Sequence, residues 1–298
     1  MIEAPSPAAT PAPVLPRGQA LWRGLRANPL LVAGGLTAVL IVVVAAAAPL
    51  LAPFPGDAGT ATHPFFVLHP PSARHWFGTD QVGRDVLSRV LYGARISPLV
   101  AVIVLLIACV IGIPLGIAAG YFGGWVDEVI MRVTDVFLAF PSLLLALALA
   151  AVLPTSLTSV TIAIAATWWP WYTRLIRGQA ASVAGRPYID SCRALGIPAW
   201  RIITRHVLPN SVTPLIVQVS LDVGGVILTA SALSFLGLGA QDPTPDWGLM
   251  VAEGQTYFTT DWWVVTFPGI AILITAFAFN LLGDGLRDLL DPKRSLLP

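Results

Sequence analysis

The sequence predicts an all-α integral membrane protein with six transmembrane helices. Of the 298 residues, 56% are hydrophobic and only 11% are charged, and the mean hydropathy is +0.77. Soluble domains carry about 25% charged residues, so a soluble fold is excluded. Several apolar runs also approach or exceed the roughly 20 residues that a helix needs to cross the hydrocarbon core. These runs are residues 30–52, 97–119, 129–153, 157–176, 211–236 and 263–283.

The cationic residues predict the direction of the chain. Residues 1–28 form a tail rich in Pro and Ala, which we expect to be flexible. If this tail lies inside, the inside segments, the tail included, contain thirteen of the 17 cationic residues. An excess of Lys and Arg marks cytoplasmic segments. The other four cations, Arg74, Arg84, Arg89 and Arg95, fall in one long outside loop. We therefore predict that both termini are cytoplasmic, with residues 288–298 as a second tail.

The outside loop over residues 54–96 would connect the first transmembrane helix, 29–53, to a core of five helices over 97–287. Its last part predicts a short amphipathic helix, because Val86, Leu87, Val90, Leu91 and Ala94 form an apolar stripe. Asp80 is a suitable N-cap, and Asp85 can pair with Arg89 one turn later. This helix would lie on the membrane or protein surface.

Three glycines in the second span, Gly112, Gly116 and Gly120, repeat every four residues. Small residues on one face allow two membrane helices to approach closely. We expect this face to pack against another helix, either within this chain or in a second subunit. Pro114 lies among the glycines and can kink the helix.

Two acidic residues fall inside predicted spans, Asp135 near the inner side and Asp222 midway along the fifth. An ionised Asp at the centre of a membrane helix costs about 2.5–3.5 kcal/mol on insertion scales, so each should face protein or water. Each is therefore either a translocation-pathway or proton site or a hydrogen-bonded helix contact, and Asp222 is the better pathway candidate. The aromatic run WWPWY, 168–172, either lines a pore or anchors the span at the interface.

The most basic stretch, residues 188–210, lies between the fourth and fifth spans within an inside loop over 186–210. Pro187 can begin a helix, Gly196 can end it, and Pro198 can begin another that Pro209 ends. We expect Trp200, Ile203 and Val207 on one side of the second helix and Arg201 with Arg205 on another. The loop is too short and too tethered to read DNA, and the net charge is only +1. It would contact either the membrane surface or a protein partner.

This loop resembles the "EAA" loop of bacterial ABC-transporter permeases. Asp190, Ser191 and Cys192 stand at the E-A-A positions, Gly196 at the glycine, and residues 208–209 at the closing Leu-Pro. Three further stretches, "FGTDQVGRDVLSRVLYGARIS" (77–97), "SFLGLGAQDPTPDWGLMVAEG" (234–254) and "GDGLRDLLDPK" (283–293), are similar to the peptide/nickel branch of these permeases, specifically its C-type subunit.

The resemblance implies the ABC type I importer permease fold and one half of a pore in the bacterial inner membrane. It implies four kinds of partner: a homologous B-type permease, two ABC ATPases that bind ATP and Mg, an extracytoplasmic substrate-binding protein, and membrane lipid, with no nucleic acid. Di- or oligopeptides are the expected solutes, and nickel chelates, glutathione and opine-like compounds are alternatives. The residues implied in coupling to the ATPase are Asp190, Ser191, Cys192, Arg193, Gly196, Arg201, Arg205 and Pro209.

The sequence contains no motif for catalysis by this chain. A P-loop requires G-x-x-x-x-G-K-S/T, and the only lysine, Lys293, follows Pro292. H-E-x-x-H and G-x-S-x-G are also missing from the sequence. We expect a non-enzymatic subunit without a cofactor or metal of its own, and a channel or secondary transporter that acts without an ATPase is the alternative class.

Overall fold

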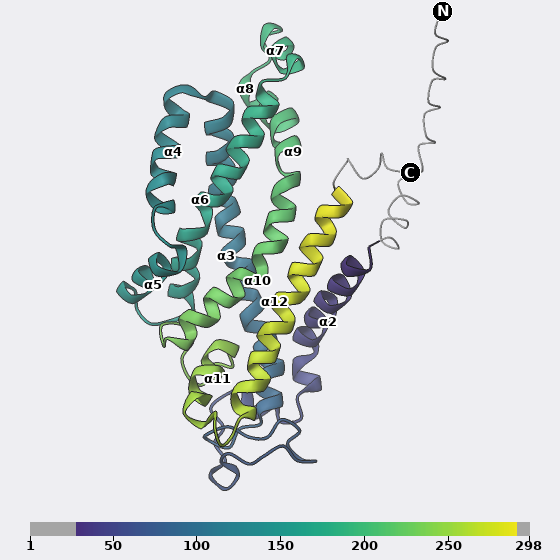
Figure 1. The fold of residues 1–298 in the computed structure, drawn as a ribbon, viewed down its shortest axis with the longest axis vertical. Helices are drawn as coiled ribbons and strands as arrows, with labels where there is room; N and C mark the ends of the chain where they lie inside the picture. The colour runs from purple at the N-terminus through teal and green to yellow at the C-terminus, as the bar shows by residue number, and fades with distance from the viewer. Residues whose placement is uncertain (1–27, 291–298) are drawn as a thin grey trace, which may run out of the picture.

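The structure, a computed structural model, describes residues 28–290, and this part of the chain is helical (Figure 1). The predicted tails fall mostly outside it. Seven of its helices form an elongated bundle: α2 (Pro29–Leu51), α3 (Val86–Phe122), α4 (Gly124–Leu138), α5 (Ser142–Val152), α6 (Leu157–Ala184), α10 (Thr213–Phe235) and α12 (Trp263–Leu290).

Four of these helices are long and apolar enough to cross a membrane: α2, α3, α10 and α12. The pair α4 and α5 would add a fifth span if its two bent halves cross together. The structure thus establishes an all-helical membrane protein with four or five candidate spans by length and composition, one or two fewer than predicted. The predicted span over 157–176 corresponds to α6, which is long but less apolar because it carries Thr, Trp and Arg side chains.

Helix α6 forms the centre of the bundle. It packs along α3 and also contacts α4, α5 and α10. Val104 of α3, Ile164 of α6 and Ile227 of α10 are fully buried between these helices. Protein rather than lipid therefore surrounds much of α6. Because only part of the helix would face lipid, α6 does not need an apolar surface on every side.

Helix α3 begins eleven residues before the predicted span and continues through Pro98 and Pro114 to Phe122. The predicted boundary between loop and core at residues 96 and 97 is therefore wrong, because the amphipathic stretch and the span are one helix of 37 residues. The N-cap is Asp85, which accepts a hydrogen bond from the Ser88 amide at 2.8 Å. Asp80, the predicted cap, instead organises the preceding turn by accepting hydrogen bonds from the amides of Val82 and Arg84.

The predicted continuous span over 129–153 is broken. Helices α4 and α5 meet at an angle of 85° across residues 139–141. Pro141 is the N-cap of α5, and a proline disfavours helical backbone in the residue before it. The physical cause of the break is therefore the Phe140–Pro141 pair, which a hydropathy profile does not detect.

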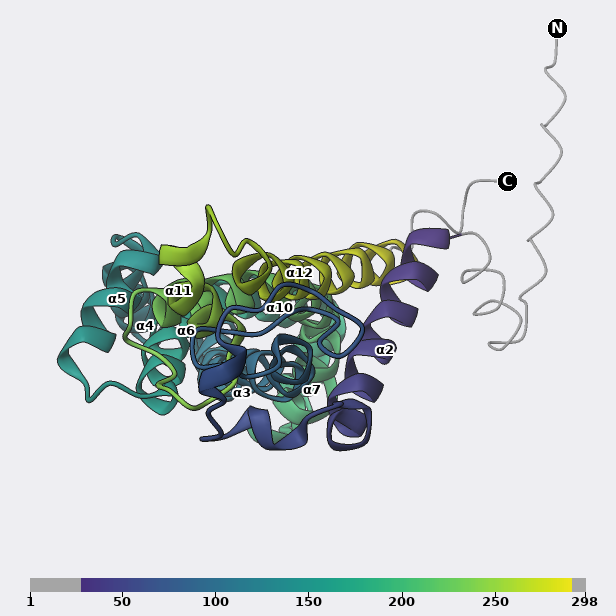
Figure 2. The same cartoon turned by 90° about the horizontal axis from the view of Figure 1, so that it is seen from below.

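The two ends of the bundle carry different structures. The first, here called the α7 end, holds α7 (Pro187–Ala194), α8 (Ala199–Ile202), a π-helical turn (Ile203–Val207) and α9 (Leu208–Ser211). The other, here called the α11 end, holds α11 (Trp247–Gly254) and the loop over residues 52–85. Figure 2 shows this loop and α11 lying over the ends of the bundle helices.

Candidate functional site

The α7 end contains the EAA-like loop. Pro187 occupies the first turn of α7, where its missing N–H needs no partner. Gly196 ends the helix with φ +74°, a left-handed conformation that favours glycine. The amide of Ile197 donates back to the Cys192 carbonyl at 3.1 Å, which satisfies an open carbonyl at the helix end. The sequence thus specifies the turn through its backbone chemistry.

A small separate core holds this loop against the bundle. Ile189, Ile202 and Val207 are buried there with Ala180 and Val183 of α6. We expected Trp200 on the apolar side of the second helix, and this prediction is wrong. Trp200 is 64% exposed, and Ile202 takes the buried position. Both Trp200 and Leu195, which is 80% exposed, therefore present apolar surface outward.

Pro209 does not end the second helix of the loop as predicted. The backbone continues through α9, where Pro209 lies in the first turn, and on into α10. The preceding turn is widened to a π-helix, in which the Leu208 amide donates to the carbonyl of Ile203. Such a turn relieves the contact between a proline ring and the carbonyl four residues earlier.

The polar residues of the loop lie on its outer surface. Asp190 and Arg193 form an ion pair at 2.9 Å, and the guanidinium of Arg193 lies 5.1 Å from the centre of the Tyr121 ring. Hydrogen bonding to Tyr121, with a smaller contribution from Asp190, raises the pKa of Arg193 above its ordinary value. Arg201, which lies over the Trp200 ring at 5.6 Å, and Arg205 are exposed.

The two remaining residues of the E-A-A positions have local partners. The Ser191 hydroxyl donates to the Pro187 carbonyl at 3.2 Å. Cys192 is half-buried and packs against the small core of the loop. The loop thus combines a fixed inner face with an outer face of charged and apolar side chains.

Asp222 lies at a cavity between α6 and α10. The cavity has a volume of about 540 Å³ and is lined by Trp168, Trp171, Arg174, Leu175, Gln218 and Asp222. The carboxylate accepts hydrogen bonds from the Tyr172 hydroxyl at 2.9 Å and from the Gln218 amide at 3.0 Å. Asp222 therefore forms a hydrogen-bonded contact between α10 and α6 and also borders a cavity.

The aromatic run WWPWY divides between the core and the cavities. Trp169 and Tyr172 are buried, whereas Trp171 is half-exposed and also borders a second cavity of about 330 Å³ beside the α4–α5 break. The predicted span ended at residue 176, which would place the run near its inner end. Because α6 continues to Ala184, the run instead lies in the middle of the helix.

Ion pairs join α4 to α6. Arg174 pairs with Asp135, the other acidic residue predicted within a span, and Arg177 pairs with Asp127. Asp135 thus has a cationic partner from the neighbouring helix. The charge of Arg174 is balanced at the border of the cavity.

The glycines of α3 face α6 of the same chain. A Cβ atom added to Gly112, Gly116 or Gly120 would lie 2.8, 2.6 or 2.4 Å, respectively, from atoms of α6. Real Cβ atoms essentially never approach so closely. Of the two packing alternatives left open by the sequence, the structure places these glycines at a seam within the chain.

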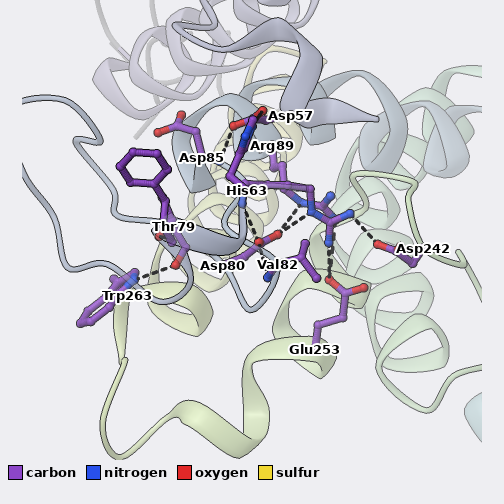
Figure 3. A network of polar contacts seen from close by, with 12 residues as sticks. Asp57, His63, Thr79, Asp80, Val82, Asp85, Arg89, Asp242, Glu253 and Trp263 are labelled. Atoms are coloured by element: carbon purple, nitrogen blue, oxygen red, sulfur yellow. Dashed lines mark hydrogen bonds and ion pairs between the residues drawn. The ribbon is translucent and has the colours of Figure 1, made fainter. Parts of the chain in front are cut away.

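The α11 end contains a charge network that the sequence analysis missed (Figure 3). Arg84 and Arg89 are 2% and 0% exposed, respectively. Arg84 pairs at 2.7 Å with both Asp80 and Asp242, and Arg89 lies 3.7 Å from Asp80 and 3.6 Å from Glu253. The predicted surface location of this stretch and the Asp85–Arg89 pair are therefore wrong. The sequence did contain an indication of it, since one predicted outside loop carries four arginines and the other, over 237–262, contains acids and no cation.

Two histidine–aspartate pairs support the same loop. His63 lies 2.9 Å from Asp57, and His75 lies 3.0 Å from Asp85, whose other oxygen caps α3. The Asp57 carboxylate also accepts from the Asp85 amide at 2.8 Å. Within residues 28–290, no group of three or more His, Cys, Asp or Glu side chains is arranged to hold a metal ion.

Comparison with known proteins shows which families and folds this chain is similar to. A family model described as "Binding-protein-dependent transport system inner membrane component" matches residues 112–296, and another, "N-terminal TM domain of oligopeptide transport permease C", matches residues 17–71. A chain in the structure of the MetNI methionine ABC transporter in inward-facing conformations aligns with a TM-score of 0.53 over 69% of this chain and 98% of its own length. At 13% identity this similarity concerns the fold alone, the type I importer permease fold.

Curated relatives share far more of the sequence. The probable D,D-dipeptide transport system permease protein DdpC of Escherichia coli strain K12 is 48% identical over 90% of this chain and 89% of its own length. The dipeptide permease protein DppC of Alkalihalophilus pseudofirmus is 43% identical (91% and 88% covered), as is the glutathione permease protein GsiD of Pectobacterium atrosepticum (91% and 90% covered). The chain therefore belongs to the family of inner membrane components of binding-protein-dependent transport systems, as a non-catalytic, multi-pass permease subunit of the C type.

Proposed function

We propose that this chain forms half of the translocation pore of an ATP-driven importer for di- or oligopeptides. The support is that its relatives are named for D,D-dipeptides, dipeptides and glutathione, and all three of these solutes are short peptides. The other half would be a homologous B-type permease. A binding protein would deliver the solute outside, and two ATPases, which bind ATP and Mg, would drive the conformational change.

The observation that carries the coupling part of this proposal is the outer surface of the α7 end. Leu195 and Trp200 expose apolar area in the same loop that exposes the charged Asp190, Arg201 and Arg205. An exposed apolar patch with a polar rim is typical of a protein interaction site. The occupant would be a groove on the ATPase, with the arginines pairing with acidic groups there.

Co-purification tests this surface. The tagged chain is purified in mild detergent from its native cell, and the accompanying proteins are identified. We expect a second permease and one or two P-loop ATPases. Trp200→Asp should reduce the amount of ATPase that co-purifies but not the amount of the second permease, because it places a charge in the apolar contact. Trp76→Asp, at an equally exposed tryptophan of the α11 end, is the matched control.

The proposal includes six spans and cytoplasmic termini, with the α7 end inside. Helix α6 would be the fourth span along the chain and would bring the total to six, because its 28 residues extend over about 42 Å at 1.5 Å per residue. Labelling of single cysteines in a variant without the native Cys109 and Cys192 tests this arrangement. A membrane-impermeant thiol reagent should label Thr260→Cys in intact spheroplasts, and Ser191→Cys only after lysis.

Uptake assays test the substrate class. Proteoliposomes with the complete importer and its binding protein should accumulate D-alanyl-D-alanine, glycylglycine or glutathione only when ATP is supplied inside. ATP-dependent uptake of a nickel chelate or an opine, with none of these peptides, would favour the alternative solutes. Solute flux by this chain without an ATPase would favour a channel or secondary transporter.

A further inference from the structure

We propose that Asp222 binds the terminal ammonium group of a transported peptide, inside the cavity between α6 and α10. This inference rests on the proposed function and names the chemical group that the pore recognises. Asp222 would contribute the charge, and Trp168 and Trp171 would contribute aromatic faces. All three residues line the same cavity.

The charge balance of the cavity favours a cationic group. Its two charged lining residues are Arg174 and Asp222. Arg174 is paired with Asp135, whereas the Tyr172 hydroxyl and the Gln218 amide, which donate hydrogen bonds to Asp222 in the described part of the chain, are neutral. The cavity therefore presents one carboxylate without a cationic partner among residues 28–290. A ligand ammonium would supply that partner.

The position of Asp222 suits a site on a pathway through the membrane. It is the tenth of the 23 residues of α10, about 15 Å along the helix at 1.5 Å per residue. Carboxylates at this depth face protein or water and mark substrate pathways. A carboxylate used only to join two helices would not need to reach a cavity.

The walls and size of the cavity suit a short peptide. Tryptophan faces attract ammonium groups through the ring quadrupole, most strongly where water is excluded. Trp168 and Trp171 are both on the cavity wall with the apolar Leu175. The volume of about 540 Å³ falls within the roughly 300–1,000 Å³ typical of small-molecule sites. The second cavity, which shares Trp171, would extend the space for the remainder of the peptide.

Equilibrium dialysis tests the inference directly. The complete membrane complex in nanodiscs, without its binding protein, is dialysed against millimolar radiolabelled D-alanyl-D-alanine. The competitor is propionyl-D-alanine, which differs only by lacking the amino group. We expect the wild-type complex to bind the dipeptide and the competitor to displace it at least about tenfold less well than unlabelled dipeptide, since a lost charged contact changes affinity by that order.

Three variants separate recognition from helix packing. Asp222→Asn should weaken binding at least about tenfold, and Asp222→Glu should retain it within about threefold, because only the first loses the charge. Tyr172→Phe removes the hydrogen bond between α6 and α10 but keeps the carboxylate, so it should stay close to wild type. Asp284→Asn, at an exposed position of α12, is the matched control.

The outcomes are distinct from those of the proposed function. Equal competition by propionyl-D-alanine, unchanged binding by Asp222→Asn, or no binding at millimolar concentration would each overturn the ammonium site. An equal loss in Tyr172→Phe and Asp222→Asn would assign Asp222 to helix packing. Uptake of D-alanyl-D-alanine in proteoliposomes would leave the importer function standing in each of these cases, whereas no uptake of any short peptide would contradict that function itself.

Discussion

Arg84 Nη1 lies 2.7 Å from Asp242 Oδ1, and this ion pair joins two loops that are 158 residues apart in the chain. The two partners differ greatly in burial, since the side chain of Arg84 is 2% exposed and that of Asp242 is 59% exposed. Arg84 also contacts the buried Asp80. Replacing Arg84 should therefore lower the free energy of unfolding more than replacing Asp242, although both changes remove the same ion pair.

Replacing Arg84 should strongly destabilise the α11 end. Arg84→Ala leaves Asp80 and Glu253 in a buried site with less compensation, and removing one partner of a buried ion pair costs about 3–5 kcal/mol. Asp242→Asn should cost no more than about 1 kcal/mol, because the carboxylate that it replaces is largely in water. Thermal unfolding of the detergent-solubilised protein measures both changes in the free energy of unfolding.

Arg95→Ala is the control, because Arg95 is an exposed residue of α3 and is not among the residues of the buried network. It should leave the unfolding temperature near that of wild type. Equal losses for Arg84→Ala and Arg95→Ala would mean that the buried network contributes no more to stability than an exposed arginine does.

Glu253 should give the α11 end a pH-dependent stability. Burial raises the pKa of its carboxyl above the ordinary value of 4.5, with partial opposition from Arg89. The folded state thus retains a proton that the unfolded state has lost, so this group reduces stability as the pH rises from about 4.5 through the raised pKa. Unfolding temperatures across this pH range should show that the wild type, relative to Glu253→Gln, loses stability toward higher pH. A wild-type curve parallel to that of the variant would contradict the assignment.

Much of the fold was accessible from hydropathy alone. The predicted runs 30–52, 211–236 and 263–283 begin within two residues of α2, α10 and α12 because an apolar helix in lipid needs no other signal. The α4–α5 break was not predicted, since it depends on the Phe140–Pro141 backbone and not on apolarity. The start of α3 was also missed, because Asp80 and Asp85 are equally good caps and only the contacts of Asp85 with Ser88 and His75 select between them.

The candidate sites likewise contain some features that the sequence could predict and others that it could not. The turn at Gly196 could be predicted because its cause is local, a left-handed backbone position followed by Pro198. The burial of Ile202 rather than Trp200 could not, since the π-helical turn over Ile203–Val207 changes the helical period between these two residues and the buried Val207. The Arg84–Asp242 pair depends entirely on tertiary structure. The cavity at Asp222 also required the relative placement of α6 and α10.

The glycine seam between α3 and α6 should tolerate no side chain. A Cβ atom at Gly116 would lie 2.6 Å from the Thr173 carbonyl oxygen and 2.8 Å from Ile176 Cβ, both fixed parts of α6. Overpacking of this kind costs about 1–3 kcal/mol, so Gly116→Ala should lower the unfolding temperature. Gly178→Ala is the matched control, because a Cβ there meets nothing within 4 Å. It should stabilise α6 by about 0.5–1 kcal/mol, and equal destabilisation by both variants would contradict the packing assignment.

The left-handed residue at the end of α7 should determine coupling without affecting assembly. Gly196 has φ +74°, and a Cβ added there meets no atom within 4 Å, so substitution strains the backbone but causes no clash. Gly196→Ala should disfavour the observed loop by roughly 1–2 kcal/mol, which lowers its population relative to other loop conformations by roughly 5–30-fold. Gly196→Asn should be milder, because Asn tolerates this conformation. Proteoliposome assays of solute imported per ATP hydrolysed should therefore rank Gly, Asn and Ala in that order at residue 196. Gly185→Ala, at φ −82° with only an ordinary contact at 3.6 Å, is the control. An Ala variant that imports as much solute per ATP as this control would show that the turn at Gly196 has no role in coupling.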